Sequence, residues 1–246
     1  MVERAWTHRA ATRDDFPALC RVFDKCFGHG RDPDFFAWKY HRNPHGPGIL
    51  RLAESDGQVV GFLGSIPRRI RVADRQVVLH HPGDAMTLPA WRGRGIMTEL
   101  FHTIFREAAS ASVTLLIGFE GRQSHKGARS AGWEEVARIR EWLLPLRTVH
   151  HLPRLEHRLP VAAAAIGTLT DRLAQPRLRR RLDRTADSLV PLDRFTADDA
   201  ALASNPSARV AMVRDEDWLN WRYRDTPSGS LQCHRPADGT GFVVAE

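Results

Sequence analysis

The residues best suited by type and spacing to chemistry form a short turn, Arg92-Gly93-Arg94-Gly95, between a strand-like stretch and a helical pattern. Where a strand ends and a helix begins, several backbone N–H groups lack partners, and the helix dipole adds partial positive charge. Glycine lets the backbone approach phosphate oxygens, and arginine adds charge-assisted hydrogen bonds. The turn therefore predicts a diphosphate site, although a tight, solvated turn before a helix would contain the same residue types.

The stretches on either side of this turn predict the elements that position it. A first helix begins near Thr12 or Asp14, ends at Gly28 and carries one apolar face. That face consists of Phe16, Leu19, Cys20, Phe23 and Phe27. Strand-like stretches follow at 49–53, 59–66, 68–72 and 76–81, with a turn at 73–75, and their succession favours antiparallel pairing. A last strand, 84–88, leads into the turn.

Beyond the turn the pattern becomes helical and then alternates again. The apolar residues at helical spacing are Met97, Leu100, Phe101, Ile104, Phe105 and Ala108. A strand at 113–119, a short helix at 124–130 ending at Gly132, and a strand from 136 to about 144 are then expected. This alternation predicts a mixed α/β fold.

A repeat links two tryptophan-bearing segments that lie 183 residues apart. Residues 31–46 align without a gap with 214–229, and Asp56-Gly57 aligns with Asp238-Gly239 after one deletion. Repeats are usually units of structure. We therefore predict a complete module over 1–149, a helical, Arg-rich connector over 150–200, and a partial second module over 201–246. The aromatic residues of the first copy either line an acceptor site or, as we favour, belong to the core.

The turn and its surroundings resemble the GNAT acetyltransferases. The family signature is Arg or Gln, two residues, Gly, one residue, then Gly or Ala, and the stretch from Pro89 to Ile96 matches it up to that final position, where Met97 stands instead. The resemblance extends from about Arg9 to Leu146 and includes Gly132-Trp133, which is similar to the family's usual Gly-Phe. The repeated Trp-Lys/Arg-Tyr motif is similar to a bacterial subgroup of the family.

The resemblance implies a GNAT-like α+β fold, with a mixed, mostly antiparallel sheet flanked by helices and a partial second GNAT-like repeat. It implies an N-acyltransferase that uses acetyl-CoA, with direct attack of a small-molecule amine on the thioester. Backbone groups near Thr87 would hold pantetheine and the thioester oxygen. The expected coenzyme A contacts are Met86, Thr87, Leu88, Arg92, Gly93, Arg94, Gly95, Ile96, Met97 and Thr98.

The catalytic residues are less clear, because the family's general-acid tyrosine aligns with Ala128 and its frequent asparagine aligns with Gly121. Protonation of the departing thiolate falls to His125 or to water, and an exposed helix position is the competing explanation for His125. Asp84 and Glu120, at strand ends near the expected cleft, are the candidate bases. Each is equally well explained as a hydrated or ion-paired carboxylate.

Composition excludes several other classes of protein. The formal net charge is +7, but the densest basic stretch, 177–184, is best explained as a solvated helix face, so we expect no nucleic-acid partner. Three cysteines without metal-ligand spacing predict a reduced, cytoplasmic protein, and paired histidines at 80–81 and 150–151 lack a third ligand, so we expect no metal. No apolar run is long enough to span a bilayer.

The sequence leaves two alternatives to acetyl transfer open. One is a GNAT-like module that binds coenzyme A or serves structurally without catalysis. The other is an acyltransferase that uses a longer acyl-CoA or an acyl carrier protein. A homo-oligomer is compatible with either, and the acceptor is not encoded by any motif.

Overall fold

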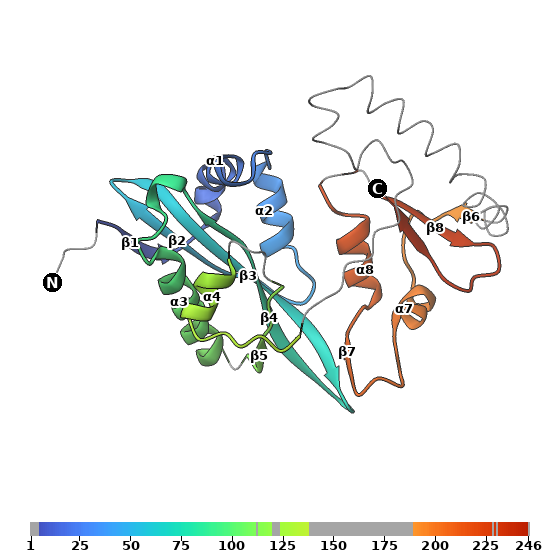
Figure 1. The fold of residues 1–246 in the computed structure, drawn as a ribbon. Helices are drawn as coiled ribbons and strands as arrows, with labels where there is room; N and C mark the ends of the chain where they lie inside the picture. The colour runs from blue at the N-terminus through green and yellow to red at the C-terminus, as the bar shows by residue number, and fades with distance from the viewer. Residues whose placement is uncertain are drawn as a thin grey trace, which may run out of the picture. The chain divides into compact units, whose positions relative to one another are not determined.

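A computed structural model describes residues 5–111, 113–119, 124–137, 189–227, 229 and 231–245. The chain divides into two compact units. The first unit consists of 1–134, 192–233 and 241–246, and the second of 135–191 and 234–240. Figure 1 labels the elements in chain order.

A curved sheet forms the centre of the first unit. Its strand order is β1-β2-β3-β4-β5, and β7 pairs with β3. All pairs are antiparallel except β4–β5, which is parallel. The strands are β1 Thr7–Ala10, β2 Ile49–Ser55, β3 Gln58–Val72, β4 Arg75–Thr87, β5 Leu115–Leu116 and β7 Val210–Met212. The predicted mixed, mostly antiparallel sheet is confirmed.

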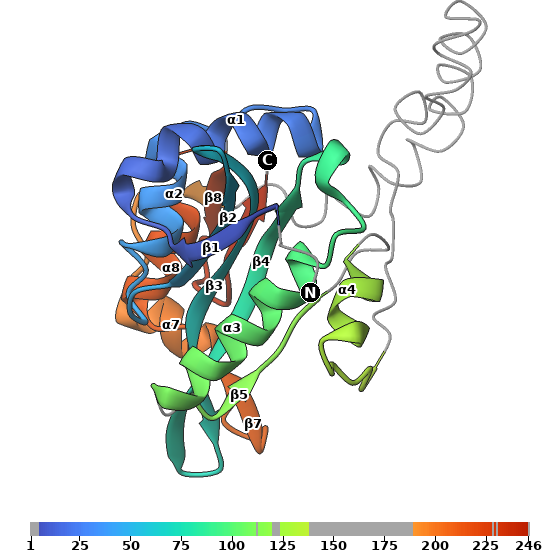
Figure 2. The ribbon, with the colours of Figure 1, turned by 90° about the vertical axis from the view of Figure 1, so that its left-hand side faces the viewer.

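Helices cover both faces of this sheet (Figures 1 and 2). α1 and α2 lie on one face, and α3 and α4 lie on the other. The short 3-10 turn η1, Arg13–Asp15, precedes α1, and η2, Pro89–Trp91, precedes α3. The helices are α1 Phe16–Phe27, α2 Pro33–Tyr40, α3 Ile96–Ser110, α4 His125–Ser130, α7 Ala197–Ala203 and α8 Glu216–Tyr223.

The first helix forms as predicted, except that Phe27, which was predicted on its apolar face, is exposed. α1 ends at Gly28, whose φ of 74° is left-handed and whose N–H donates to the Asp24 carbonyl. The helix buries Phe16, Leu19 and Phe23 against the sheet, together with Val22. Its periodic apolar face therefore made this helix predictable.

Several predicted strands differ from those in the structure. β3 is one strand rather than two, because Pro67 lies between the end of the β2 pairing at Ser65 and the start of the β7 pairing at Ile70. A proline that lacks an N–H donor is tolerated there. The strand predicted at 113–119 is only Leu115–Leu116, and residues 136–137 are not in a strand. The rest of that predicted strand, to about Leu144, lies outside the described residues, as do residues 150–188 of the predicted connector.

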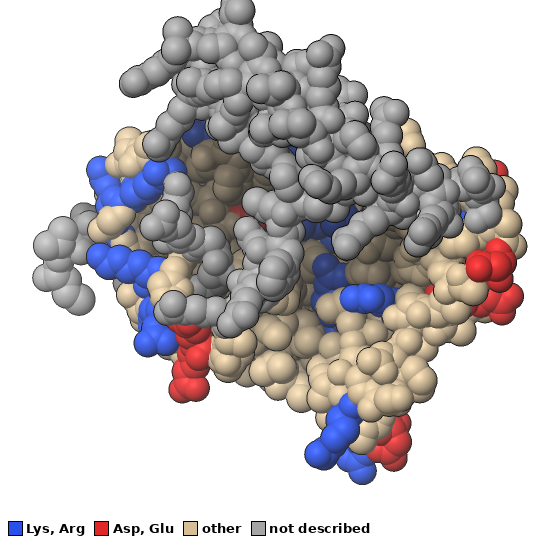
Figure 3. All heavy atoms as spheres, turned by 45° about the vertical axis from the view of Figure 1, so that its right-hand side comes forward, with Lys and Arg blue, Asp and Glu red and all other residues tan. Residues whose placement is uncertain are grey.

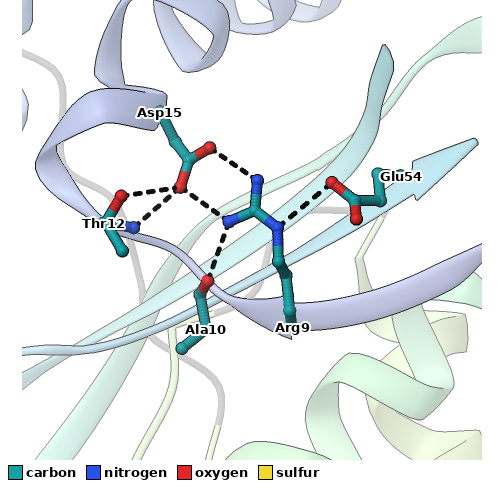
Figure 4. A network of polar contacts seen from close by, with 5 residues as sticks. All are labelled: Arg9, Ala10, Thr12, Asp15 and Glu54. Carbon is teal, nitrogen blue, oxygen red and sulfur yellow. Dashed lines mark hydrogen bonds and ion pairs between the residues drawn. The ribbon is translucent and has the colours of Figure 1, made fainter. Parts of the chain in front are cut away.

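A network of charges fixes the first strand to its neighbours (Figure 4). The Arg9 guanidinium donates to both Asp15 oxygens at 2.8 Å and to Glu54 at 3.1 Å. Thr12 also donates its N–H to Asp15. The hydrogen bonds from Arg9 lower the pKa of Asp15 to about 2. The network thus connects β1, the turn before α1, and β2.

The segment after residue 191 packs against α2. Asp32 and Asp215 each accept a hydrogen bond from the N–H three residues later, and so cap α2 and α8 in the same way. The indole N–H of Trp38 donates to the Trp221 carbonyl at 2.8 Å, and the indole N–H of Trp221 donates to the Trp38 carbonyl at 3.0 Å. The two rings stack with centroids 4.8 Å apart. The partners in each bond are therefore 183 residues apart.

Further elements of the C-terminal segment begin before residue 201. α7 opens with a capping box between Thr196 and Asp199, as η1 does between Thr12 and Asp15. β9, Val243–Ala245, belongs to the first unit. In the second unit, β6, Leu189–Pro191, pairs antiparallel with residues 234–236 of β8, Gln232–Pro236.

The Trp38–Trp221 contact yields the first prediction. Replacing Trp221 with Ala should lower the free energy of unfolding by about 3–5 kcal/mol, because a fully packed aromatic side chain is lost. Trp221→Phe keeps most of the ring but leaves the Trp38 carbonyl without its donor, so a smaller loss of about 1–3 kcal/mol is expected. Urea denaturation followed by circular dichroism measures both.

A double-mutant cycle with Trp38→Ala provides the control. Both hydrogen bonds end on main-chain carbonyls that a substitution leaves in place, so the cycle reports the ring stack, whose coupling energy should be about 0.5–1.5 kcal/mol. Strictly additive losses would contradict the contact.

Candidate functional site

The predicted phosphate turn is an open helix N-terminus. Gly95 is the N-cap of α3, and Gly93 and Gly95 have left-handed φ values of 77° and 76°. No side chain caps the helix. A Cβ added to either glycine would meet no atom within 4 Å, so the backbone here is open to a ligand. The first N–H groups of α3 thus remain available for an anion.

The two arginines of the turn are held in place while their charges remain exposed. Arg92 Nε donates to the Thr87 carbonyl at 3.2 Å. The Arg94 guanidinium lies 4.5 Å from the centre of the Trp91 ring. Both side chains are exposed to solvent. Their positive charge is therefore added to that of the helix N-terminus.

This turn borders a cavity of about 1250 Å³. Seven of the ten predicted coenzyme A contacts line it: Thr87, Arg92, Gly93, Gly95, Ile96, Met97 and Thr98. Aromatic side chains of α1, Phe23 and Phe27, form part of the opposite wall. The cavity therefore joins the turn to the first helix across the end of β4.

Three predicted contacts do not line the cavity. Met86 is fully buried and Leu88 is 7% exposed, so their side chains belong to the core. The Leu88 N–H already donates to the Val60 carbonyl. Arg94 is exposed beside the cavity rather than in its wall. The alternation of side chains along β4 explains why Thr87 faces the cavity and its neighbours do not.

The departure at Met97 has a packing explanation. A Cβ added to Gly127 of α4 would lie 3.5 Å from Met97 Cγ. The larger side chain on α3 thus faces a glycine on α4, so the position packs without obstructing the turn.

β4 separates from its parallel neighbour as it approaches the turn. Its pairing with β5 covers only Leu79 and His80, and the last hydrogen bond runs from the Ile117 N–H to the His80 carbonyl. From Pro82 to Thr87, no described strand pairs with this edge of β4. Backbone groups on this edge are therefore available to an extended ligand.

Asp84 is the predicted base that the structure brings to the cavity. Its φ of 52° is left-handed, at a register shift between β3 and β4. Both carboxylate oxygens lie 2.8 Å from Lys39 Nζ, and Oδ2 accepts a hydrogen bond from the Tyr40 hydroxyl at 2.8 Å. Burial, followed by the Asp84 charge, raises the pKa of Tyr40 well above its usual value. Tyr40 therefore stays protonated, and its hydroxyl donates a hydrogen bond to Asp84.

The structure does not place His125 in the cavity lining, and it does not describe Glu120. The His125 side chain is exposed. Ala128, at the family's tyrosine position, is fully buried in the core. Asp84 is therefore the candidate that the structure describes at the cavity, and the catalytic roles of all three residues stay predictions.

Sequence reasoning missed Lys39 and Tyr40 as partners of Asp84. The repeated Trp-Lys/Arg-Tyr motif was the available signal, but its aromatic residues predict core packing equally well. They do pack there: Phe36, Trp38 and Tyr40 are at most 5% exposed. Gly64 makes room for this arrangement, because a Cβ at that position would overlap the Tyr40 ring.

The described residues contain no group of three or more His, Cys, Asp or Glu side chains that could hold a metal ion. None of their helices combines the length and the apolar character needed to cross a membrane.

Comparison with solved structures identifies a fold relative. A probable N-acyltransferase from Enterococcus faecalis V583 is 11% identical and has a TM-score of 0.57. The match covers 98% of this chain and 55% of that one, and at this identity it shows the fold alone.

Sequence comparisons identify the family. A mycothiol acetyltransferase from Nocardiopsis dassonvillei is 29% identical over 109 residues, which are 44% of this chain. The matched part is only 31% of that curated relative's length. The model of the acetyltransferase (GNAT) domain matches residues 7–136, which are more than half of the chain and include the turn, the cavity-lining residues and strands β1 to β5. The chain therefore belongs to the GNAT acetyltransferase family.

Proposed function

We propose that this protein transfers an acyl group, acetyl in the first instance, from coenzyme A to the amine of a small molecule. The observation that carries the proposal is the open N-terminus of α3, with two left-handed glycines and two arginines, beside a cavity that also contains Asp84. The residues present fit the donor. Backbone N–H groups and cations bind a diphosphate, and the two glycines of the turn have no Cβ that would keep it away from the N–H groups. When bound, the donor supplies an acyl thioester.

Different residues of the chain would bind the donor, polarise its carbonyl and accept the proton of the amine. The N–H groups at the start of α3, with Arg92 and Arg94, would hold the diphosphate. The unpaired edge of β4 before Thr87 would hold the extended arm and polarise the carbonyl. Asp84 would orient the acceptor amine and receive its proton, directly or through water. The amine then attacks the carbonyl without a covalent enzyme intermediate.

The surroundings of Asp84 support this role. An ionised carboxylate has about four acceptor positions. Lys39 and Tyr40 occupy three of them. One position thus remains for a hydrogen bond from the acceptor. We assign protonation of the departing thiolate to water rather than to His125, because that side chain is outside the cavity lining.

We also infer that the partial second copy of the family fold, predicted at 201–246, begins earlier, by Thr196, so that the connector predicted at 150–200 ends before that residue. The shared helix caps, the paired capping boxes and the 183-residue spacing of the tryptophan contacts support this inference. The free cysteines, Cys20, Cys26 and Cys233, are consistent with a reducing cytoplasm as the place of the reaction.

A coenzyme A-binding module without turnover is the second candidate. The buried Ala128 favours it, because the family's usual acid cannot act from that position. Binding without release of free thiol would distinguish this candidate from the enzyme.

Reversing the charge of the turn should weaken donor binding. In an Arg92→Glu, Arg94→Glu variant, each lost charge-assisted hydrogen bond should weaken the affinity for acetyl-CoA by about tenfold or more. Isothermal titration calorimetry measures the dissociation constant.

An Arg75→Glu, Arg209→Glu variant is the matched control, because it makes the same charge change at exposed positions away from the cavity. It should bind as the wild type does. Absence of binding by the wild type would overturn the proposal.

Removing the charge of Asp84 should slow the transfer while leaving donor binding intact. Asp84→Asn keeps an oxygen for Tyr40 and Lys39 but removes the base, so kcat/KM should fall by about 100-fold or more. Release of free thiol from acetyl-CoA over a panel of small amines measures the rate.

Asp74→Asn, in the exposed turn between β3 and β4, is the matched control. A kcat/KM within twofold of the wild type for Asp84→Asn would exclude Asp84 as the base.

A further inference from the structure

Lys39 and Arg222 occupy the same place in their two helices. Each lies in the last turn and precedes a tyrosine, and the two positions are 183 residues apart. Their surroundings differ. Lys39 Nζ contacts the Asp84 carboxylate at 2.8 Å, whereas Arg222 has no carboxylate partner among the residues that the structure describes. The charge of Lys39 is therefore neutralised and that of Arg222 is not.

Arg68, on β3, is a second cation at this place. Its guanidinium carbon lies 5.2 Å from the centre of the Trp218 ring, and Nη1 lies 3.9 Å from Met212 Sδ. Its Nε is buried and has no hydrogen-bond partner within the described part of the chain. Burial and then the charges of Arg222 and Arg214 lower its pKa to about 10, so it remains a cation at neutral pH.

The Trp218 ring next to Arg68 is 6.0 Å from the Tyr223 ring next to Arg222, and neither arginine has a carboxylate partner among the described residues. Like charges near each other away from bulk water repel, and a buried N–H without an acceptor costs free energy. A bound anion would remove both costs. The planar guanidinium, with several N–H donors, suits a carboxylate or a phosphate.

Neither arginine is among the residues that line the cavity, but Arg68 lies on the β3–β4 ladder, whose end at Asp84 does line it. Arg68 is on the same face of the β3–β4 ladder as His81, and the charges of Arg68, Lys39 and Asp84 all act on His81. The His81 ring is 5.4 Å from that of Phe119, which lines the cavity. Figure 3 shows that Lys and Arg side chains also gather within a hollow of the face that it draws. An acceptor amine at Asp84 could therefore extend its other end toward the arginines.

We propose that Arg68 and Arg222 form an anion subsite for the acceptor, which would thus be a small amine that also carries a carboxylate or a phosphate. The inference rests on the proposed acyl transfer and names the class of its acceptor. Polycationic amines are disfavoured acceptors, because the two arginines repel them.

Inorganic phosphate tests the subsite without any acyl transfer. The full chain carrying Arg92→Glu and Arg94→Glu is used, so that the phosphate turn does not contribute. Titration should change the tryptophan fluorescence saturably, because Trp218 lies under Arg68 and Trp221 precedes Arg222. Adding Arg222→Gln should weaken phosphate binding by about tenfold or more, whereas Arg209→Gln, an exposed matched control, should not. Equal affinities with and without Arg222→Gln, or no saturable change, would overturn the subsite.

Matched acceptors then test its role in the wild-type chain. Glucosamine 6-phosphate is compared with glucosamine, and β-alanine with β-alaninamide, by release of free thiol from acetyl-CoA. The preferred anionic member should have a kcat/KM about tenfold or more above its neutral partner, and Arg222→Gln should remove that preference. The two pairs distinguish phosphate from carboxylate.

The two experiments separate the two proposals. Phosphate binding that depends on Arg222, without transfer to any amine, would support the subsite and count against acyl transfer. Transfer at equal rates to charged and neutral amines, without phosphate binding, would overturn the subsite alone.

Discussion

The hydrogen-bonded carboxylate of Asp84 is the interaction on which the site depends. Asp84 has a left-handed backbone at the register shift of β4, and its oxygens are held by Lys39 and Tyr40 of α2. α2 is thereby attached to the end of the strand that leads into the phosphate turn. If this attachment were lost, the edge of β4, the turn and the start of α3 would no longer be held in one arrangement.

The same arrangement explains why the cavity lies where it does. β4 leaves β5 after His80, and α3 begins at the open turn only a few residues beyond Thr87. Gly61 allows α3 to approach closely, since a Cβ there would lie 2.8 Å from Ile96 Cγ2. The strand edge and the helix N-terminus therefore share one wall of the cavity, so one extended ligand can contact both.

Local patterns made much of this predictable. The apolar period of α1, the two glycines before α3 and the alternation of the early strands each require only neighbouring residues. The shortness of β5, the continuity of β3 through Pro67 and the role of Lys39 depend on which distant segments pair, so no window of sequence contains them. Met86 and Leu88 are two residues whose contacts could not be predicted from neighbouring residues alone. Their place beside Thr87 was predictable, but the face on which each side chain lies depends on the bulge at Asp84.

The contact between Trp38 and Trp221 should restrict the substitutions that each of these positions tolerates. Each indole N–H donates to the other residue's main-chain carbonyl, so a substitution at either position leaves one carbonyl without its donor and removes one ring of the stack. Single substitutions at either position should therefore lower stability. Substitutions are thus expected to accumulate faster in the loops of the two segments than at this pair.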